Sequence, residues 1–140
     1  GDFDALCQQL HRYQATLRTC FTLENFDNLI KNGRMRPIVG TLLRSLGIHI
    51  IADATAEGTI HVADKARGVG KTYRAITALM KASKDCTDAE VVISHCENLE
   101  GAMALKRQIL ADLPVKQVDL LSCRGLTSFY AMEKGLIVGY

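Results

Sequence analysis

The segment Gly68-Val69-Gly70-Lys71-Thr72 carries residue types that can bind nucleotide phosphates, because Gly-Lys-Thr is the ending of a P-loop. In a P-loop, a further glycine stands five residues before the glycine that precedes the lysine, and here that position holds Lys65. The segment also follows a polar strand-like stretch, whereas a P-loop follows a buried strand. A phosphotransfer enzyme using residues 68–72 is therefore the weaker hypothesis. The alternative is a basic loop that leads into a helix.

Ser94-His95-Cys96 places a nucleophile beside a base at the end of a buried strand, where ligands gather in α/β proteins. Neighbouring strand side chains point to opposite faces, so this pairing lacks the geometry for base catalysis. A histidine that bonds the following loop is the favoured interpretation. No carboxylate pair is spaced to share acid and base roles. The sequence thus predicts no catalytic residue.

The cysteines are odd in number and widely separated, and no pair of them forms a C-x-x-C motif. This pattern argues against a disulfide framework and against a zinc site, so no metal and no cofactor are predicted. Buried free thiols are expected instead. The five positions are Cys7, Cys20, Cys86, Cys96 and Cys123.

The turn Lys31-Asn32-Gly33-Arg34 follows a short amphipathic segment. Gly33 suits the left-handed position just past a helix, where a side chain would be costly. A sharp turn there would hold Arg34 beside an apolar helix, and a fixed guanidinium can clamp an anion. The residues alone leave two readings open, an anion clamp and a solvated arginine.

The chain has 140 residues, of which 48% are hydrophobic and 23% charged, as expected of a single globular domain. Its formal charge of +2 is too small to predict a nucleic-acid partner. The longest apolar stretch, residues 37–51, contains Arg44 and His49 and falls short of the ~20 residues that span a bilayer. We therefore expect buried core, no membrane span and a cytoplasmic location.

The hydrophobic pattern predicts an α/β fold with helices packed on a mixed β-sheet. Asn25 and Asn98 are predicted helix N-caps, and residues 65–71 are predicted to form a basic loop. Helical spacing is found over residues 3–17, 26–30, 37–46, 73–80 and 99–110. Strand patterns are found over residues 20–23, 48–53, 59–64, 91–93, 115–121 and 136–138, the second and third forming a hairpin.

Several of these segments occur in the order and spacing of the C-terminal domain of the DegV family, and together they cover nearly all of the chain. The family's Lys-x-Gly-Gly-Arg turn, helix and strand resemble Lys31-Asn32-Gly33-Arg34, Leu42-Leu43 and Leu46-Gly47-Ile48. Its basic segment after the hairpin is similar to Lys65-Ala66-Arg67-Gly68 with Lys71. Its strand-to-helix unit resembles Val92-Ile93-Ser94-His95 with Asn98, Glu100-Gly101-Ala102 and Leu105.

This resemblance implies a non-catalytic bacterial protein that sequesters a long-chain fatty acid and presents its carboxylate to a separate fatty acid kinase. By position, Arg34 would lie near the head group. The following helix would wall the acyl tunnel through Ile38, Leu42 and Leu46. Arg67, assisted by Lys71, would belong to the surface that meets the kinase. The chain would be the C-terminal half of such a protein, a single domain over residues 1–140 without the N-terminal domain.

The chain departs from the family pattern near its end. Where the family carries a Thr-His-x-Gly segment whose histidine contacts the head group, this chain has Thr127-Ser128-Phe129-Tyr130-Ala131. Ser128 or Tyr130 could donate a replacement hydrogen bond, but neither supplies the charge of an imidazolium. We therefore place Ser128, Phe129 and Tyr130 near the polar end of the ligand. A ligand-free interaction or regulatory domain of the same fold is the alternative.

Overall fold

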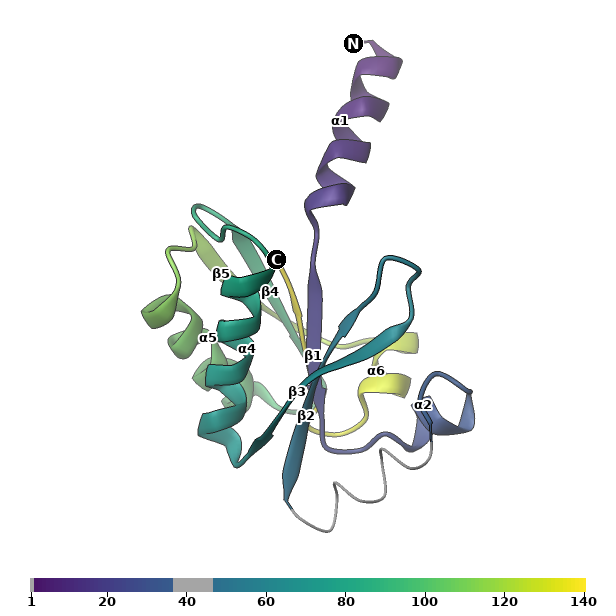
Figure 1. Ribbon diagram of the computed structural model, residues 1–140, viewed down its shortest axis with the longest axis vertical. Helices are drawn as coiled ribbons and strands as arrows, with labels where there is room; N and C mark the ends of the chain where they lie inside the picture. Colours follow the sequence, from purple (N-terminus) through teal and green to yellow (C-terminus); the bar gives the residue numbers. More distant parts are fainter. Residues whose placement is uncertain (1, 37–46) are drawn as a thin grey trace.

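A computed structural model describes residues 2–36 and 47–140 and has a six-stranded mixed sheet at its centre (Figure 1). The strand order is β3-β2-β1-β6-β4-β5, in which β4 and β5 are parallel and the other neighbours antiparallel. The strands are β1 (Thr19–Leu23), β2 (Ile48–Ala54), β3 (Ile60–Arg67), β4 (Glu90–His95), β5 (Gln117–Ser122) and β6 (Leu136–Gly139). The helices are α1 (Phe3–Thr16), α2 (Asp27–Lys31), α4 (Val69–Ser83), α5 (Leu99–Asp112) and α6 (Gly125–Ala131). The predicted fold class is confirmed.

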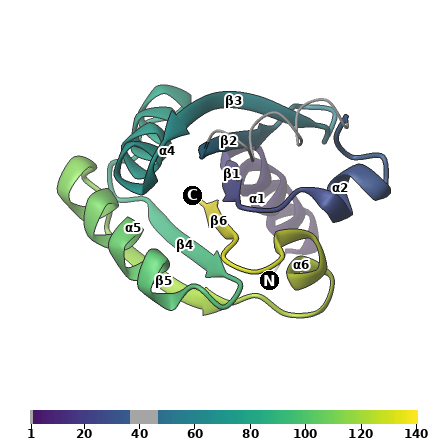
Figure 2. The ribbon, with the colours of Figure 1, turned by 90° about the horizontal axis from the view of Figure 1, so that it is seen from below.

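The larger core lies between one face of the sheet and helices α4 and α5 (Figure 2). Strand β4 lies between β6 and β5 and buries alternate residues, because successive side chains of a strand point to opposite faces of the sheet. Helix α5 begins at the predicted cap, since the Asn98 side chain accepts a hydrogen bond from the Gly101 amide. The fully buried side chains of this core include Ile51, Ile76, Met80, Val91, Ile93, Leu105, Ile109, Leu136 and Val138.

The opposite face of the sheet carries the short helices α2 and α6 over a smaller apolar cluster (Figure 2). The buried members of this cluster are Leu23, Phe26, Leu29, Met35, Ile50, Ala52 and Ala131. The two faces are thus covered by different pairs of helices. Helices α2 and α6, with the predicted site residues near them, lie on the same face of the sheet.

A bulge in the β2–β3 hairpin lets β3 contribute to both faces. The pairing register shifts between Ile51 and Ala52, so Val62 lies opposite Ala52 on the α2 side. Beyond the bulge, Ala66 lies opposite His49 and joins the core beneath α4. The beginning of β3, around Val62, therefore packs on the α2 side of the sheet, and its end, around Ala66, packs beneath α4.

Helix α1 extends away from the sheet (Figure 1), and none of its residues is buried. The helix predicted over residues 3–17 is confirmed, but its apolar side chains are solvent-exposed. The exposed fractions of Phe3, Leu6, Leu10 and Tyr13 are 74%, 63%, 53% and 62%.

Three local predictions differ from the structure. Helix α2 begins after Phe26, one residue later than predicted, and the Asn25 side chain accepts from the Asp27 amide in a turn before the helix. The predicted basic loop does not form, because β3 continues to Arg67 and α4 begins at Val69. Helix α6 was not predicted at all. The predicted helix over residues 37–46 lies outside the described residues.

Candidate functional site

The turn after α2 fixes the backbone of Arg34. Gly33 adopts the predicted left-handed conformation, with a φ of +71°, and its amide donates to the Ile30 carbonyl at 3.0 Å. The amides of Arg34 and Met35 both donate to the Leu29 carbonyl, at 2.8 and 3.2 Å. Since the Met35 side chain is buried, the chain is anchored on both sides of Arg34 while the arginine itself is exposed.

The Arg34 side chain meets helix α6. Its guanidinium carbon lies 5.6 Å from the centre of the Tyr130 ring, and its Nη1 donates to the Asn32 carbonyl at 2.8 Å. The Tyr130 ring in turn stands edge-on to Phe129, with centroids 5.0 Å apart and an interplanar angle of 79°. A guanidinium has five N–H donors, so this arrangement orients the group and leaves donors for an anion.

Helix α6 is tied directly to α2. The Asn28 side-chain amide donates to the Phe129 carbonyl at 2.6 Å, and Ala131 is buried in the cluster beneath both helices. The Ser128 carbonyl accepts from the Met132 amide and closes the helix, while the Ser128 side chain is half-buried. The structure therefore places the predicted segment around Phe129 and Tyr130 beside Arg34.

An open groove of about 770 Å³ runs from the end of α2 to the outer part of the hairpin. Such a volume lies within the range of small-molecule sites. Two guanidinium groups, those of Arg34 and Arg36, stand among mainly apolar neighbours. The lining residues are Ile30, Gly33, Arg34, Met35, Arg36, Gly58, Thr59, Ile60 and Val62. This combination suits a ligand with an apolar body and an anionic end.

Sequence reasoning missed the hairpin wall of this groove and also missed Arg36. The available signal was the strand pattern over residues 59–64, in which the apolar residues Ile60 and Val62 alternate with His61 and Ala63. The strand pattern alone could not identify the far side of the groove, because it contains no information about which helix lies over the strand.

The other predicted site residues lie elsewhere or outside the described part of the chain. Ile38, Leu42 and Leu46 belong to residues 37–46 and are not described. Arg67 is the last residue of β3 and Lys71 lies in the first turn of α4; both side chains are exposed. Neither lines the groove at Arg34.

The P-loop-like segment forms the start of α4. Gly68, with a φ of +84°, occupies the cap position, and the Thr72 hydroxyl donates to the Gly68 carbonyl at 3.1 Å. Thr72 is buried, whereas a P-loop hydroxyl binds Mg²⁺. The strand before it, β3, is at the edge of the sheet. This geometry does not favour phosphotransfer.

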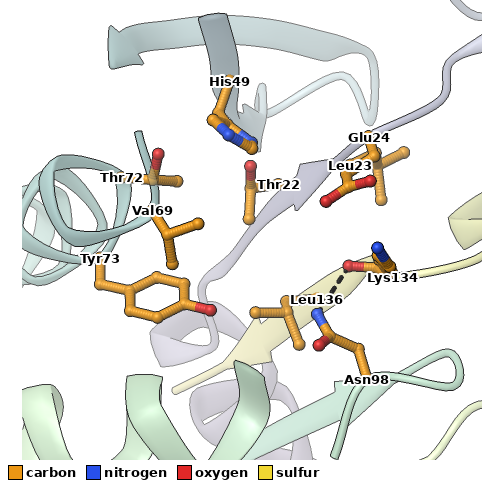
Figure 3. A pocket seen from close by; sticks show the side chains of 10 residues that line it. All are labelled: Thr22, Leu23, Glu24, His49, Val69, Thr72, Tyr73, Asn98, Lys134 and Leu136. Carbon is orange, nitrogen blue, oxygen red and sulfur yellow. Dashed lines mark hydrogen bonds between the residues drawn. The ribbon is translucent and has the colours of Figure 1, made fainter. Parts of the chain in front are cut away.

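A second, much smaller pocket lies on the α4 side of the sheet (Figure 3). Its volume of about 30 Å³ is on the scale of one water molecule and excludes an acyl chain. Burial raises the pKa of Tyr73, and the Glu24 and Glu100 carboxylates make smaller contributions in the same direction. The pocket is lined by Thr22, Leu23, Glu24, His49, Val69, Thr72, Tyr73, Asn98, Lys134 and Leu136.

Among residues 2–36 and 47–140, no group of three or more His, Cys, Asp or Glu side chains could hold a metal ion. In the same part of the chain, no helix is long and apolar enough to cross a bilayer.

Comparison with known proteins identifies the family. The model for uncharacterised proteins of the DegV family matches residues 1–136. The chain belongs to the DegV family. A DegV domain-containing protein of Streptococcus gordonii is 32% identical over 139 residues, which are 99% of this chain and 49% of that protein. The chain thus spans about half the length of the curated DegV relatives it matches.

Solved DegV structures have the same fold. The Streptococcus pneumoniae Fatty Acid Kinase (Fak) B3 protein loaded with linoleic acid is 32% identical with a TM-score of 0.90, covering 100% of this chain and 50% of that one. A DegV family protein from Eubacterium eligens loaded with heptadecanoic acid is 26% identical with a TM-score of 0.90, covering 99% and 50%. The sequence-based assignment to this family is confirmed.

Proposed function

We propose that this DegV chain binds a long-chain fatty acid without chemically changing it. The observation that carries the proposal is Arg34, held over Tyr130 at 5.6 Å, at the edge of the groove of about 770 Å³. Two similar DegV proteins carry linoleic and heptadecanoic acids, which have an apolar tail and one carboxylate. The groove offers surfaces of both kinds.

The two parts of the ligand would be bound by different forces. Each methylene buried against side chains such as Ile30, Ile60 and Val62 contributes roughly 0.8 kcal/mol. The carboxylate would be bound by Arg34, with Arg36 nearby and the Ser128–Tyr130 segment at the polar end. By the family resemblance, Ile38, Leu42 and Leu46, which lie outside the described residues, would add to the apolar wall.

We further infer that the chain is the C-terminal half of a cytoplasmic two-domain carrier that presents the acid to a fatty acid kinase. Arg67 and Lys71 are both exposed at the junction of β3 and α4, and neither lines the groove. Two cations there suit an acidic partner surface. The kinase would perform the chemistry, and this chain would supply no catalytic group.

The test is native mass spectrometry and thermal unfolding of the purified protein with palmitate, oleate and the methyl ester of each acid. The ester keeps the tail but removes the negative charge. We expect one acyl chain per molecule and a larger rise in Tm with acid than with ester. No bound acid and no change in Tm with either acid would contradict the proposal.

A ligand-free interaction domain is favoured by one observation. The resemblance implies a head-group histidine in the segment that forms α6, where this chain instead has residues that include Phe129, which is 47% exposed. This function would be supported if the protein takes up no fatty acid but binds the kinase, and if that binding requires Arg67.

A further inference from the structure

Cys96 and Cys123 lie side by side at the ends of the two parallel strands. His95, the last residue of β4, pairs with Ser122, the last residue of β5, and each cysteine is the first residue after its strand. The Cys123 amide donates to the His95 carbonyl at 2.8 Å, which continues the parallel ladder by one residue. The Cys96 amide donates to the Gly135 carbonyl at 3.0 Å, which holds Cys96 beside the segment that leads into β6.

Both thiols point to the same face. Both cysteines pack against the cluster beneath α2 and α6, so they lie on the same side of the sheet. Burial raises the pKa of Cys123, and the negative charge of a nearby Cys96 thiolate raises it further. The second effect is consistent with two thiols that lie close together. Neighbouring strands are about 4.8 Å apart, within the roughly 4.4–6.8 Å between Cα atoms that a disulfide requires.

The remaining cysteines are not placed in this way. Cys20 and Cys86 are buried in the larger core on the other side of the sheet, and Cys7 lies on the projecting helix α1. Cys96 and Cys123 are both only partly buried. They are therefore the two thiols that combine mutual proximity with access to solvent.

We propose that Cys96 and Cys123 form a dithiol site that a small two-electron oxidant such as hydrogen peroxide converts into a disulfide. One thiolate attacks a peroxide oxygen, the O–O bond breaks, and a sulfenic acid and water result. The second thiolate then attacks the sulfenic sulfur, forming the S–S bond and releasing the oxygen as water. In total, two thiols and one peroxide give one disulfide and two waters.

The location gives this reaction a structural consequence. Cys123 is followed by Arg124, which occupies the N-cap position of α6, so a bond to Cys96 would fasten the start of α6 to the end of β4. Helix α6 carries Tyr130, the residue against which Arg34 rests. Oxidation would thus restrict the helix that orients Arg34. The dithiol site itself does not depend on the proposed ligand.

The test is peptide mapping of the reduced chain after exposure to hydrogen peroxide, alkylation and tryptic digestion without reduction. A Cys96–Cys123 bond joins the peptides 85–106 and 117–124 with the loss of two hydrogens. Because peptide 85–106 also contains Cys86, the Cys86→Ala variant is analysed beside the unaltered chain. We expect the joined peptide to be the main oxidation product in both, and absent from Cys96→Ala and Cys123→Ala.

Oxidation in concentrated urea provides the control for folding, because pairing there should spread over all five cysteines. The proposal is overturned if folded Cys86→Ala yields both thiols alkylated or singly overoxidised with no joined peptide. It is equally overturned if the joined peptide is no more abundant in the folded chain than in urea.

Discussion

The guanidinium carbon of Arg34 lies 5.6 Å from the centre of the Tyr130 ring, which joins the turn after α2 to helix α6. The sequence left two roles open for Arg34, an anion clamp and a solvated side chain. Tyr130 belongs to the segment that stands where the family resemblance led us to expect a histidine. The contact between them fixes the direction of the charge at the edge of the groove.

Replacing Arg34 by Gln should weaken fatty-acid binding about tenfold to a hundredfold, because a hydrogen bond to a charged group contributes roughly 1.5–3 kcal/mol. Binding of the methyl ester should change little. Titration calorimetry with oleate measures both. Arg107→Gln, on the exposed side of α5, is the matched control and should bind as the unaltered chain does. Equal affinity of Arg34→Gln and Arg107→Gln for oleate would contradict the assignment.

Replacing Tyr130 by Leu should lower oleate affinity roughly two- to fivefold, since an exposed cation–π contact is worth about 0.5–1 kcal/mol. The leucine keeps an apolar side chain but removes the ring that orients Arg34. Tyr130→Phe retains the ring and should retain the affinity. If the phenylalanine variant loses as much affinity as the leucine variant, the hydroxyl rather than the ring is what matters.

Gly33→Ala should lower the free energy of unfolding by about 1 kcal/mol, because the left-handed backbone disfavours a Cβ. A Cβ at Gly33 would meet no atom within 4 Å, so the effect comes from backbone strain alone. Gly70→Ala is the comparison: it also meets nothing within 4 Å, but it lies in α4 and should stabilise by about 0.5–1 kcal/mol. Urea unfolding measures both, and a neutral Gly33→Ala would refute the strain argument.

Thr77→Val should lower the Tm by roughly 2–5 °C at pH 7. The Thr77 hydroxyl donates a hydrogen bond to Asp112 Oδ2 at 2.8 Å. This hydrogen bond is the largest cause of the lowered pKa of Asp112, and a hydrogen bond from Gln108 is the second. A carboxyl whose pKa is lower in the folded chain stabilises the fold when the pH is above its ordinary pKa of 3.8. That stabilisation is lost as the pH falls through the pKa of the folded state.

The difference in Tm between Thr77→Val and the unaltered chain should therefore narrow below about pH 4. Thr77→Ser keeps the hydroxyl and should show a smaller difference that varies less with pH. Calorimetric scans from pH 7 to pH 3 decide the matter. A difference for Thr77→Val that stays constant over this range would show that Asp112 is not involved.

The sequence by itself determined the parts that depend on neighbouring residues. Gly33 ended a helix and placed Arg34 after it, and Asn98 capped α5, because capping and turn preferences act over three or four residues. Hydrophobic periodicity located the strands and most helices for the same reason. The sequence does not predict helix α6, because its seven residues are too few for a clear period and include Thr127 and Phe129, which have low helix propensity.

Only the tertiary structure decided which of these elements meet. Helix α6 is held in place by Asn28, whose amide bonds the Phe129 carbonyl, and by the burial of Ala131, and both contacts join distant parts of the chain. The sheet order sets Cys96 beside Cys123, and the bulge in β3 turns Val62 toward the groove. Strand pairing and packing arise from contacts among all the elements at once, and local preferences do not encode them.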